Sequence, residues 1–464
     1  MQTQNRWTEL NTQFVELYHR GEFDQAESLV PQLIKTGERR FEKEHLELAA
    51  CLNNIAELYR ARETFPKSIL FHKKALAIRE KLLREDAVER ANSLNNLGVL
   101  YKDKGDLSQA HAYHNRALKI KQKALGPNHP EVATTLNNLS ILLKVEGNLP
   151  EAEKMCRRAL TIREKIFGNA HPDTASSLNN LAVIKEMNGN FREAEALYRR
   201  ALEAVEKAVG SAHSDTAVVQ NNLAHLLKTQ RKYPEAEKLL ISALGTKEAL
   251  HGKECLGIAS LLISLAEIKK AQARLAAAEP LLQRARRIME KHIGADHPEI
   301  ATCLNTLAAL YKEQGKFEES EFLYKKVLNI TEANFPRIHP NIAAALNNLA
   351  VLYDAQGRYE AAESLYKRAL RVVEDAHGTE HPNVASALYN IAGLCLQLGN
   401  FNDAINYYRR ALMIREKAFG QHHVSVLSVL NALARAYQLL GDEEEAHRFQ
   451  ERAVALSAPN GKTF

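Results

Sequence analysis

The sequence predicts an all-α fold, a right-handed α-solenoid of about eleven helical hairpins. Two observations carry this prediction: an internal repeat of 42 residues runs through the 464-residue chain, and each repeat contains two segments with helical periodicity. Composition is the third observation. Hydrophobic residues make up 45% of the chain and charged residues 25%, which is ordinary for a globular protein and excludes collagen-like and disordered chains.

The repeat is anchored by the motif Leu-Asn-Asn-Leu, which begins at Leu94, Leu136, Leu178 and Leu346. We number positions so that this first leucine is position 4, and no insertion or deletion is then needed. Position 4 of repeats 1 to 11 falls at residues 10, 52, 94, 136, 178, 220, 262, 304, 346, 388 and 430. We therefore expect a single solenoid over residues 1–456, followed by a C-terminal tail over residues 457–464.

Each repeat predicts two helices. The first carries apolar residues at positions 4, 7, 8 and 11, the spacing of one helical face, and glycine at position 15 ends it in eight repeats. The second helix carries small residues at positions 20 and 27, which allow close approach. A Gly-x-x-His-Pro turn, as at Gly378, then leads to the next repeat, with proline suited to a helix start. Residues 231–275 lack the usual glycine and this turn, so they are predicted weak points.

These residues resemble the tetratricopeptide repeat. The longer form, with Leu-Asn-Asn-Leu-Ala, Gly-x-x-His-Pro and Ala-Leu-x-Ile-Arg-Glu-Lys as at 159–165 and 411–417, is similar to kinesin light chains. The resemblance covers residues 7 to 456 and implies a cargo-binding subunit of a microtubule motor, with a kinesin heavy chain as partner. That family carries a heptad coiled coil ahead of its repeats, whereas here the repeats begin by residue 10.

A ligand-binding groove is predicted on the first helices. At ~100° per residue, positions 2, 5, 9 and 12 form one stripe beside the core face. Asparagine at position 5 offers a donor and an acceptor to an extended peptide, and the cations of position 12 favour acidic side chains. The candidate residues are Asn53, Asn95, Asn137, Asn179, Asn221, Asn305, Asn347, Arg60, Lys102, Lys144, Lys228, Lys270 and Lys312. Position 2 is small and often hydroxylic.

Structural interpretations compete with this one. Asparagine at position 6 is expected to bond the neighbouring repeat, the asparagines of position 5 could do the same, and the position 12 cations could be a solvated face. Eight histidines occupy one position between repeats, at His45, His129, His171, His213, His297, His339, His381 and His423. We interpret them as cap or loop hydrogen-bond partners, since they are too far apart to share a metal.

No catalytic, metal or cofactor site is predicted. The sequence has no Gly-rich phosphate loop, G-x-S-x-G or H-E-x-x-H motif, and the recurring glutamates of the second helix, such as Glu321, suggest a structural role. His111 and His114 have helical spacing but no further ligands, and four of the five cysteines are expected to be core residues. A net charge of +6 is too small for a dedicated nucleic-acid binder.

Together these features predict a soluble, cytoplasmic, non-catalytic adaptor that binds protein partners through acidic or extended peptide segments. It would be cytoskeleton-associated if it is a motor subunit. The alternatives are a free-standing scaffold of the same repeats or, remotely, an enzyme with an unrecognised site. With no apolar signal segment and no long apolar stretch, membrane insertion is not expected.

Overall fold

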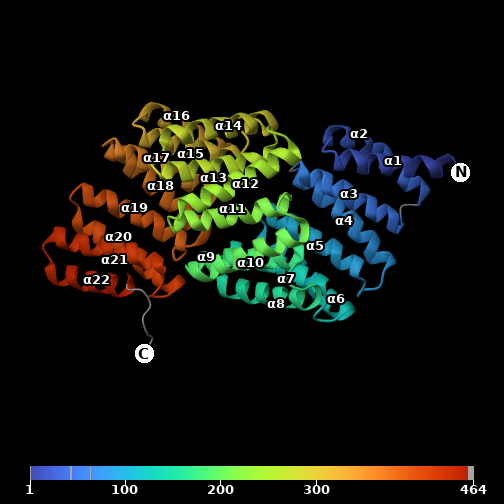
Figure 1. Ribbon diagram of the computed structural model, residues 1–464, viewed down its shortest axis with the longest axis horizontal. Coiled ribbons are helices and arrows are strands. Elements are labelled where there is room, and N and C mark those ends of the chain that lie inside the picture. Colours follow the sequence, from blue (N-terminus) through green and yellow to red (C-terminus); the bar gives the residue numbers. More distant parts are fainter. Residues whose placement is uncertain (1, 42–43, 63, 458–464) are drawn as a thin grey trace. The chain divides into compact units, whose positions relative to one another are not determined.

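The computed structural model describes residues 2–41, 44–62 and 64–457, and in these ranges it contains twenty-two α-helices, one short 3-10 helix and no strand. The predicted all-α solenoid is therefore confirmed. Odd-numbered helices are the first helices of the repeats and even-numbered helices the second, and each odd helix packs against the even helix that follows it (Figure 1). Most of the predicted tail, residues 458–464, lies outside the described residues.

The helices form two compact units, each described by itself here. Unit 1 comprises the chain up to Met187 and Arg192–Ala208, and unit 2 comprises Asn188–Phe191 and the chain from Val209. The helices of unit 1 are α1 (Gln2–His19), α2 (Phe23–Arg40), α3 (Leu46–Ala61), α4 (Phe65–Leu82), α5 (Val88–Asp103), α6 (Leu107–Leu125), α7 (Pro130–Val145), α8 (Leu149–Phe167), α9 (Pro172–Met187) and α10 (Phe191–Val209).

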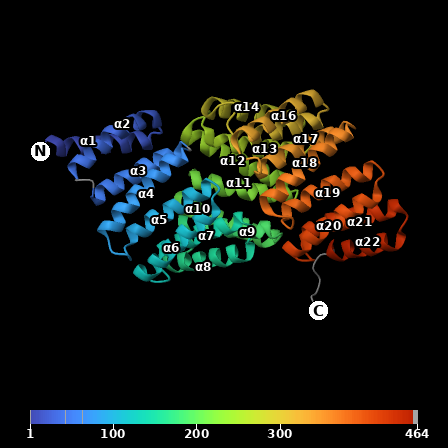
Figure 2. The ribbon, with the colours of Figure 1, turned by 180° about the vertical axis from the view of Figure 1, so that it is seen from behind.

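Unit 2 continues the same hairpins, and its last helices lie side by side when viewed from either direction (Figure 2). They are α11 (Ser214–Thr229), α12 (Tyr233–His251), the 3-10 helix η1 (Leu256–Ile258), α13 (Ala259–Ala271), α14 (Leu275–Ile293), α15 (Ile300–Glu313), α16 (Phe317–Asn334), α17 (Pro340–Ala355), α18 (Tyr359–His377), α19 (Pro382–Gln397), α20 (Phe401–Phe419), α21 (Val424–Leu440) and α22 (Glu443–Ser457).

The core occupies the predicted positions. In repeat 9, Leu346, Leu349, Ala350 and Tyr353 are all buried, as is the alanine of position 20. The two repeats with serine at position 20 follow the same plan, since the Ser68 hydroxyl donates to the carbonyl of Ala56 at 2.7 Å and Ser320 repeats the bond. A buried hydroxyl thus finds an acceptor at position 8 of the first helix.

Position 15 has a left-handed backbone, in the turn within the hairpin, in every repeat for which the structure describes that residue. Glycine adopts it at little cost, as at Gly357 with φ of +73°. Repeats 6 and 7 place Arg231 and Ala273 there, with φ of 59° and 57°, and these are the only non-glycine residues with positive φ in the described chain. The predicted weak segment therefore contains two strained residues.

The eight histidines between repeats cap the first helices, as predicted. In each, the ring Nδ1 accepts the backbone N–H two residues later; His381, for example, accepts from Asn383 at 3.2 Å. The ring often stacks on the residue four before it, as His171 does on Phe167. Because the bond needs an unprotonated Nδ1, the cap depends on a neutral imidazole.

An ionic ladder ties the second helices together. Arginine at position 26 reaches the glutamate at position 32 of the preceding repeat, as in Arg200 and Glu164 at 2.8 Å. The other pairs are Arg116–Glu80, Arg284–Glu248, Arg368–Glu332, Arg410–Glu374 and Arg452–Glu416. Each exposed pair contributes only about 0–1 kcal/mol, but the series fixes the spacing of neighbouring repeats.

Candidate functional site

The first helices present the predicted stripe. The residues of position 2 that were expected to line it are all exposed, namely Thr134, Ser176, Ser260, Thr302, Ser386 and Ser428. The asparagines of position 5 are mostly half-buried, and Asn137 is buried. The stripe is thus accessible at one edge, while its asparagines lie against the neighbouring helix.

Asparagine bonds join consecutive first helices. The side chain of position 6 donates to the Oδ1 of position 5 in the preceding repeat, from Asn138 to Asn95 at 3.1 Å in unit 1. Unit 2 has two such bonds in succession, from Asn348 to Asn305 at 3.3 Å and from Asn390 to Asn347 at 2.5 Å. The predicted bonding of position 6 to its neighbour is confirmed at these junctions, which we call the asparagine rungs.

The rungs change what position 5 can offer a ligand. The Oδ1 of Asn95 also lies 3.0 Å from Nδ1 of His114, so both lone pairs of that oxygen are used. We expected Asn95 to supply a donor and an acceptor, but its acceptor is already engaged and only its Nδ2 donors can serve a peptide. Asn137 likewise donates to Ser177 at 3.1 Å.

His114, noted in the sequence for its spacing to His111, belongs to this arrangement. Its ring is buried under Gly98, where a Cβ atom would lie 2.6 Å from the imidazole. Burial and then the charge of His111 lower the pKa of His114 to about 4, so the ring is neutral. Nowhere in the described residues do three His, Cys, Asp or Glu side chains gather as a metal-binding group.

The cations of position 12 are mostly paired. Arg60 lies 2.7 Å from Glu57, and Lys102 lies 2.9 Å from Asp103. In unit 2, Lys228 pairs with Glu267 at 2.6 Å and Lys270 with Glu313 at 3.0 Å. The expected basic strip is therefore mixed in charge over most of its length.

Lys144 differs from these lysines. Burial and then the charge of Lys102 lower the pKa of Lys144 below the ordinary lysine value. A like charge and partial desolvation both disfavour its ammonium, so an anion placed against it would be favoured.

A charged hollow of unit 2 brings three predicted residues together. Lys228, Lys270 and Asn305 line a cavity of about 450 Å³ with Glu267, Glu313, Tyr233 and Tyr324. Lys312 does not line this cavity. Arg60, Asn53 and Asn95 belong to unit 1 and do not line it either. Here two cations, two carboxylates and two phenols surround a rung.

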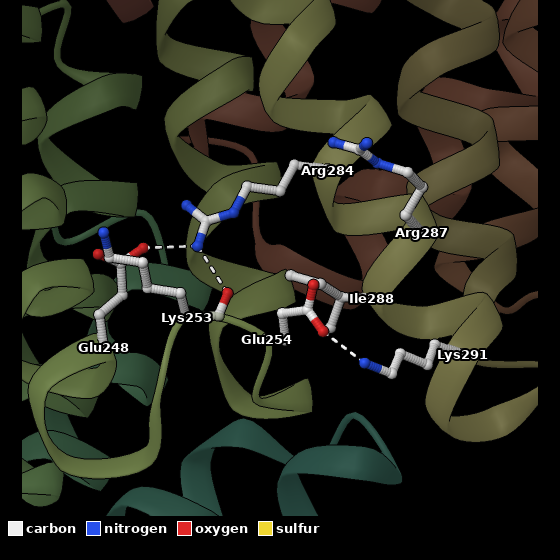
Figure 3. A pocket seen from close by; sticks show the side chains of 7 residues that line it. All are labelled: Glu248, Lys253, Glu254, Arg284, Arg287, Ile288 and Lys291. Atoms are coloured by element: carbon white, nitrogen blue, oxygen red, sulfur yellow. Dashed lines mark hydrogen bonds and ion pairs between the residues drawn. The ribbon is translucent and has the colours of Figure 1, made fainter.

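The second hollow with strong charge lies on the second helices and has a structural explanation. It has a volume of about 400 Å³ and includes Lys253, Arg284 and Lys291 (Figure 3). Arg284 is one member of the ionic ladder, and its bond to the carbonyl of Lys253 matches that of Arg410 to Thr379. Lys291 reaches Glu254 just as Lys417 reaches Glu380. The charges in this hollow therefore hold the repeats together.

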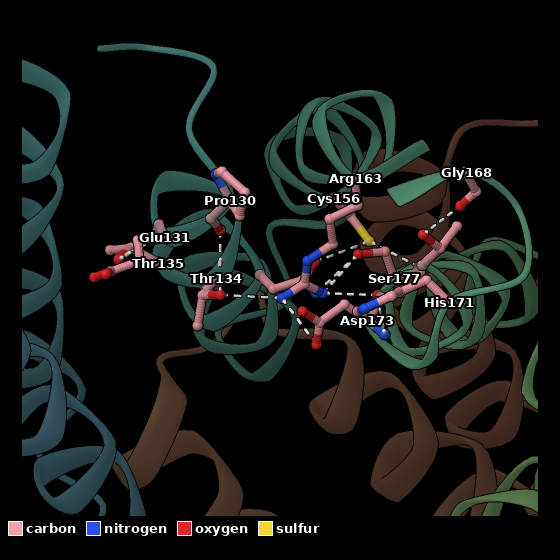
Figure 4. A network of polar contacts seen from close by, with 12 residues as sticks. Pro130, Glu131, Thr134, Thr135, Cys156, Arg163, Gly168, His171, Asp173 and Ser177 are labelled. Atoms are coloured by element: carbon pink, nitrogen blue, oxygen red, sulfur yellow. Dashed lines mark hydrogen bonds and ion pairs between the residues drawn. The ribbon is translucent and has the colours of Figure 1, made fainter. Parts of the chain in front are cut away.

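The sequence analysis missed a polar network at position 31. The buried Arg163 of α8 donates to the carbonyl of Asp173 and to the hydroxyl of Ser177, both at 2.9 Å, and to the hydroxyl of Thr134 at 3.1 Å (Figure 4). Arg79 bonds the equivalent carbonyl and hydroxyl, of Glu89 and Ser93. Arg415 bonds the equivalent carbonyl, of Ser425, and the hydroxyl of Ser428, one residue before the position equivalent to Ser177. The basic residues at position 31, Arg79, Lys121, Arg163, Lys247 and Arg415, were the available signal.

The recurring glutamates of position 21 have the structural role expected of them. Glu321 accepts from the hydroxyl of Tyr353 at 2.9 Å and from Arg358 at 2.8 Å, both in the next repeat. The Lys325 ammonium lowers the pKa of Glu321, so this carboxylate is held ionised. Three of the four cysteines expected in the core, Cys51, Cys156 and Cys303, are buried, and burial raises the pKa of each thiol to about 12. The fourth, Cys395, is half-buried.

The repeats of this chain match those of a known protein family. The tetratricopeptide repeat model matches residues 15–81, 62–123, 89–145, 131–207, 215–291, 257–333, 341–417 and 399–458. The search of curated proteins gives no match. No helix among those described is long and apolar enough to cross a membrane.

Solved structures give distant likenesses. BtubC (BKLC) from P. vanneervenii is 20% identical with a TM-score of 0.41, over 51% of this chain and 95% of that chain. A putative kinesin light chain of Podosopora anserina with nearly identical TPR-like repeats is 25% identical with a TM-score of 0.38, over 44% and 96%. Human IFIT1, solved as a dimer with PPP-AAAA, is 16% identical with a TM-score of 0.46, over 89% and 91%. On the extent of the repeat match, the chain belongs to the tetratricopeptide repeat family.

Proposed function

We propose that the protein is a non-catalytic adaptor that binds extended acidic peptide segments along its first helices. The observation that carries this proposal is that Lys144 is half-buried and, among the described residues, has no ion pair of the kind that Lys102, Lys228 and Lys270 have; burial and the charge of Lys102 lower its pKa. A carboxylate of a ligand placed between the two lysines would relieve both effects. Such a ligand would gain more at Lys144 than at the paired cations of the strip, of which Lys102 is one.

The asparagine beside these lysines supports an extended backbone. Positions 5 and 12 are about 20° apart in projection and two turns apart along a helix, so Asn95 and Lys102 share one edge of α5. With its Oδ1 engaged, Asn95 donates through Nδ2 to a carbonyl of the peptide. One repeat thus holds a main-chain carbonyl and an acidic side chain.

The experiment is a titration with peptides selected from a random phage-displayed library against the full chain. Selected peptides should be rich in Asp and Glu. The double variant Lys102→Glu with Lys144→Glu should bind them about tenfold more weakly at low salt. The matched control is Lys119→Glu with Lys123→Glu, which makes the same charge change at exposed positions of α6 and should bind nearly as the wild type does. Equal affinity for all three proteins would contradict the proposal.

The finer proposal is that the chain serves as a kinesin light chain, a cytoplasmic cargo-binding subunit of a microtubule motor. It is supported by the Ala-Leu-x-Ile-Arg-Glu-Lys sequences at 159–165 and 411–417 and by the Gly-x-x-His-Pro turns. Co-elution of the purified chain with purified kinesin heavy chain in size-exclusion chromatography would support it. Separate elution at micromolar concentrations would contradict it and leave an adaptor outside the motor.

A further inference from the structure

A neutral hollow opens between α17 and α19 in unit 2. Its volume is about 330 Å³, and it is lined by alanine and valine side chains, among them Ala344, Val373 and Ala387, and by uncharged polar side chains, among them Asn383 and Ser386. None of its eleven lining residues is charged, in a chain with 25% charged residues. The Asn347–Asn390 rung forms part of its rim.

In repeat 4 an arginine side chain fills the place that corresponds to this hollow. There, position 31 is Arg163, whose guanidinium lies among Thr134 at position 2, Asp173 at position 41 and Ser177 at position 3 of the next repeat. The same positions around the hollow in repeat 9 are Val373, Ala344, Asn383 and Ala387. The space that Arg163 fills in one repeat is therefore open in the other.

Three of the four residues change together. Arginine becomes valine, and the two hydroxyls that would accept from a guanidinium become methyl groups. A shortened side chain alone would take one donor from each hydroxyl, whereas these exchanges remove the donor and both acceptors at once. The result is an uncharged pocket with valine and alanine where repeat 4 has a guanidinium and two hydroxyls, lined also by Asn383 and Ser386.

We infer that this pocket seats a leucine- or isoleucine-sized side chain of the peptide ligand. The inference rests on the proposed function. An arginine side chain has more non-hydrogen atoms than a valine side chain, by the same number that a leucine or isoleucine side chain contains, so the opening left by the exchange can admit a small aliphatic group. A charged side chain would lose hydration here and meet no counter-charge. The rung engages the Oδ1 of Asn347, so the Nδ2 amide of Asn347 is the group left to donate to the peptide backbone.

The test begins with random phage-displayed peptides selected on the wild-type chain. The selected peptides should share leucine or isoleucine at one position, and its replacement by alanine should weaken binding to the wild type about tenfold. A first variant, Val373→Arg with Ala344→Thr and Ala387→Ser, rebuilds the network of repeat 4 inside the pocket. A second, Ala344→Leu, fills the pocket from an exposed position of α17, where the change does not disturb the core.

Both filled variants should bind the leucine and alanine forms of the peptide equally, with helical circular dichroism like that of the wild type. Selected peptides that bind the wild type without a shared aliphatic residue would overturn the pocket but leave the proposed function in place. So would a leucine preference that both variants retain. If the wild type selects no peptide at all, the proposed function fails, and the pocket assignment with it.

Discussion

Repeats 4 and 9 have the same backbone plan and opposite chemistry at the junction with the next repeat. Repeat 4 closes the junction with the buried guanidinium of Arg163 and the hydroxyls it bonds, whereas repeat 9 leaves a neutral hollow beside Val373. The hairpin core is unaffected, because positions 4, 7 and 8 are buried in both repeats. Position 31 can therefore be varied between a structural bond and an open surface without altering the fold.

The largest effect is expected from Arg163→Val. The substitution removes the guanidinium donor from the carbonyl of Asp173 and from the buried hydroxyl of Ser177, which keeps the amide donor of Asn137, at a cost of about 3 kcal/mol of unfolding free energy. Chemical denaturation measures it. Adding Thr134→Ala and Ser177→Ala copies repeat 9 and should restore part of the loss. A triple variant less stable than the single variant would show that the residues of repeat 9 cannot replace the arginine network of repeat 4.

The reciprocal change is Val373→Arg. A guanidinium in repeat 9 would find the carbonyl of Asn383 but methyl groups in place of hydroxyls, so we expect a loss of about 2 kcal/mol. Supplying Thr at 344 and Ser at 387 should recover most of it. If Val373→Arg is as stable as the wild type by thermal unfolding, the hollow is large enough for the arginine to reach water, and the comparison weakens.

The cap that follows repeat 9 should give a pH dependence. Burial, and next to it the charge of His377, lower the pKa of His381 in the native state. Below about pH 6.5 the imidazole of His381 binds a proton in the unfolded chain more readily than in the native cap, so the unfolding free energy falls as the pH falls. His381→Asn keeps a capping side chain that does not titrate, and should flatten this dependence of unfolding free energy on pH. Equal pH profiles of the two proteins would exclude the cap as the source.

The smallest effect concerns the turns of the irregular repeats. Repeats 4 and 9 have Gly147 and Gly357 at position 15, whereas Arg231 and Ala273 hold positive φ angles there. Ala273→Gly should stabilise the protein by about 1 kcal/mol, because the left-handed conformation is no longer strained. In the wild type, hydrogen exchange should be faster over residues 231–275 than over residues 346–420. In the variant, exchange over residues 231–275 should be slower than it is in the wild type. Uniform protection of both segments would remove the distinction between regular and irregular repeats.

The sequence was sufficient for the features that depend on local spacing. The 42-residue register located the buried positions, the histidine caps and the bonding of position 6, because each involves residues that recur at a fixed position of the repeat. It did not show that Lys228 and Lys270 are paired with Glu267 and Glu313, since those glutamates lie at positions 9 and 13, where most repeats have other residues. Nor did it separate Arg163 from Val373, because their partners lie ten or more residues away across a turn. The expected single solenoid from 1 to 456 stays a prediction, and two compact units are what the chain forms.

The measurement that tests the account most directly is photocrosslinking of a selected peptide to the full chain, followed by mass spectrometry of the adducts. The account predicts cross-links on odd-numbered helices, at positions 2, 5 and 9, with acidic residues of the peptide near Lys144 in unit 1, and with an aliphatic residue near Ala344 for peptides bound at the hollow of unit 2. Cross-links confined to even-numbered helices, along the ionic ladder, would contradict it, since those charges are already paired between repeats.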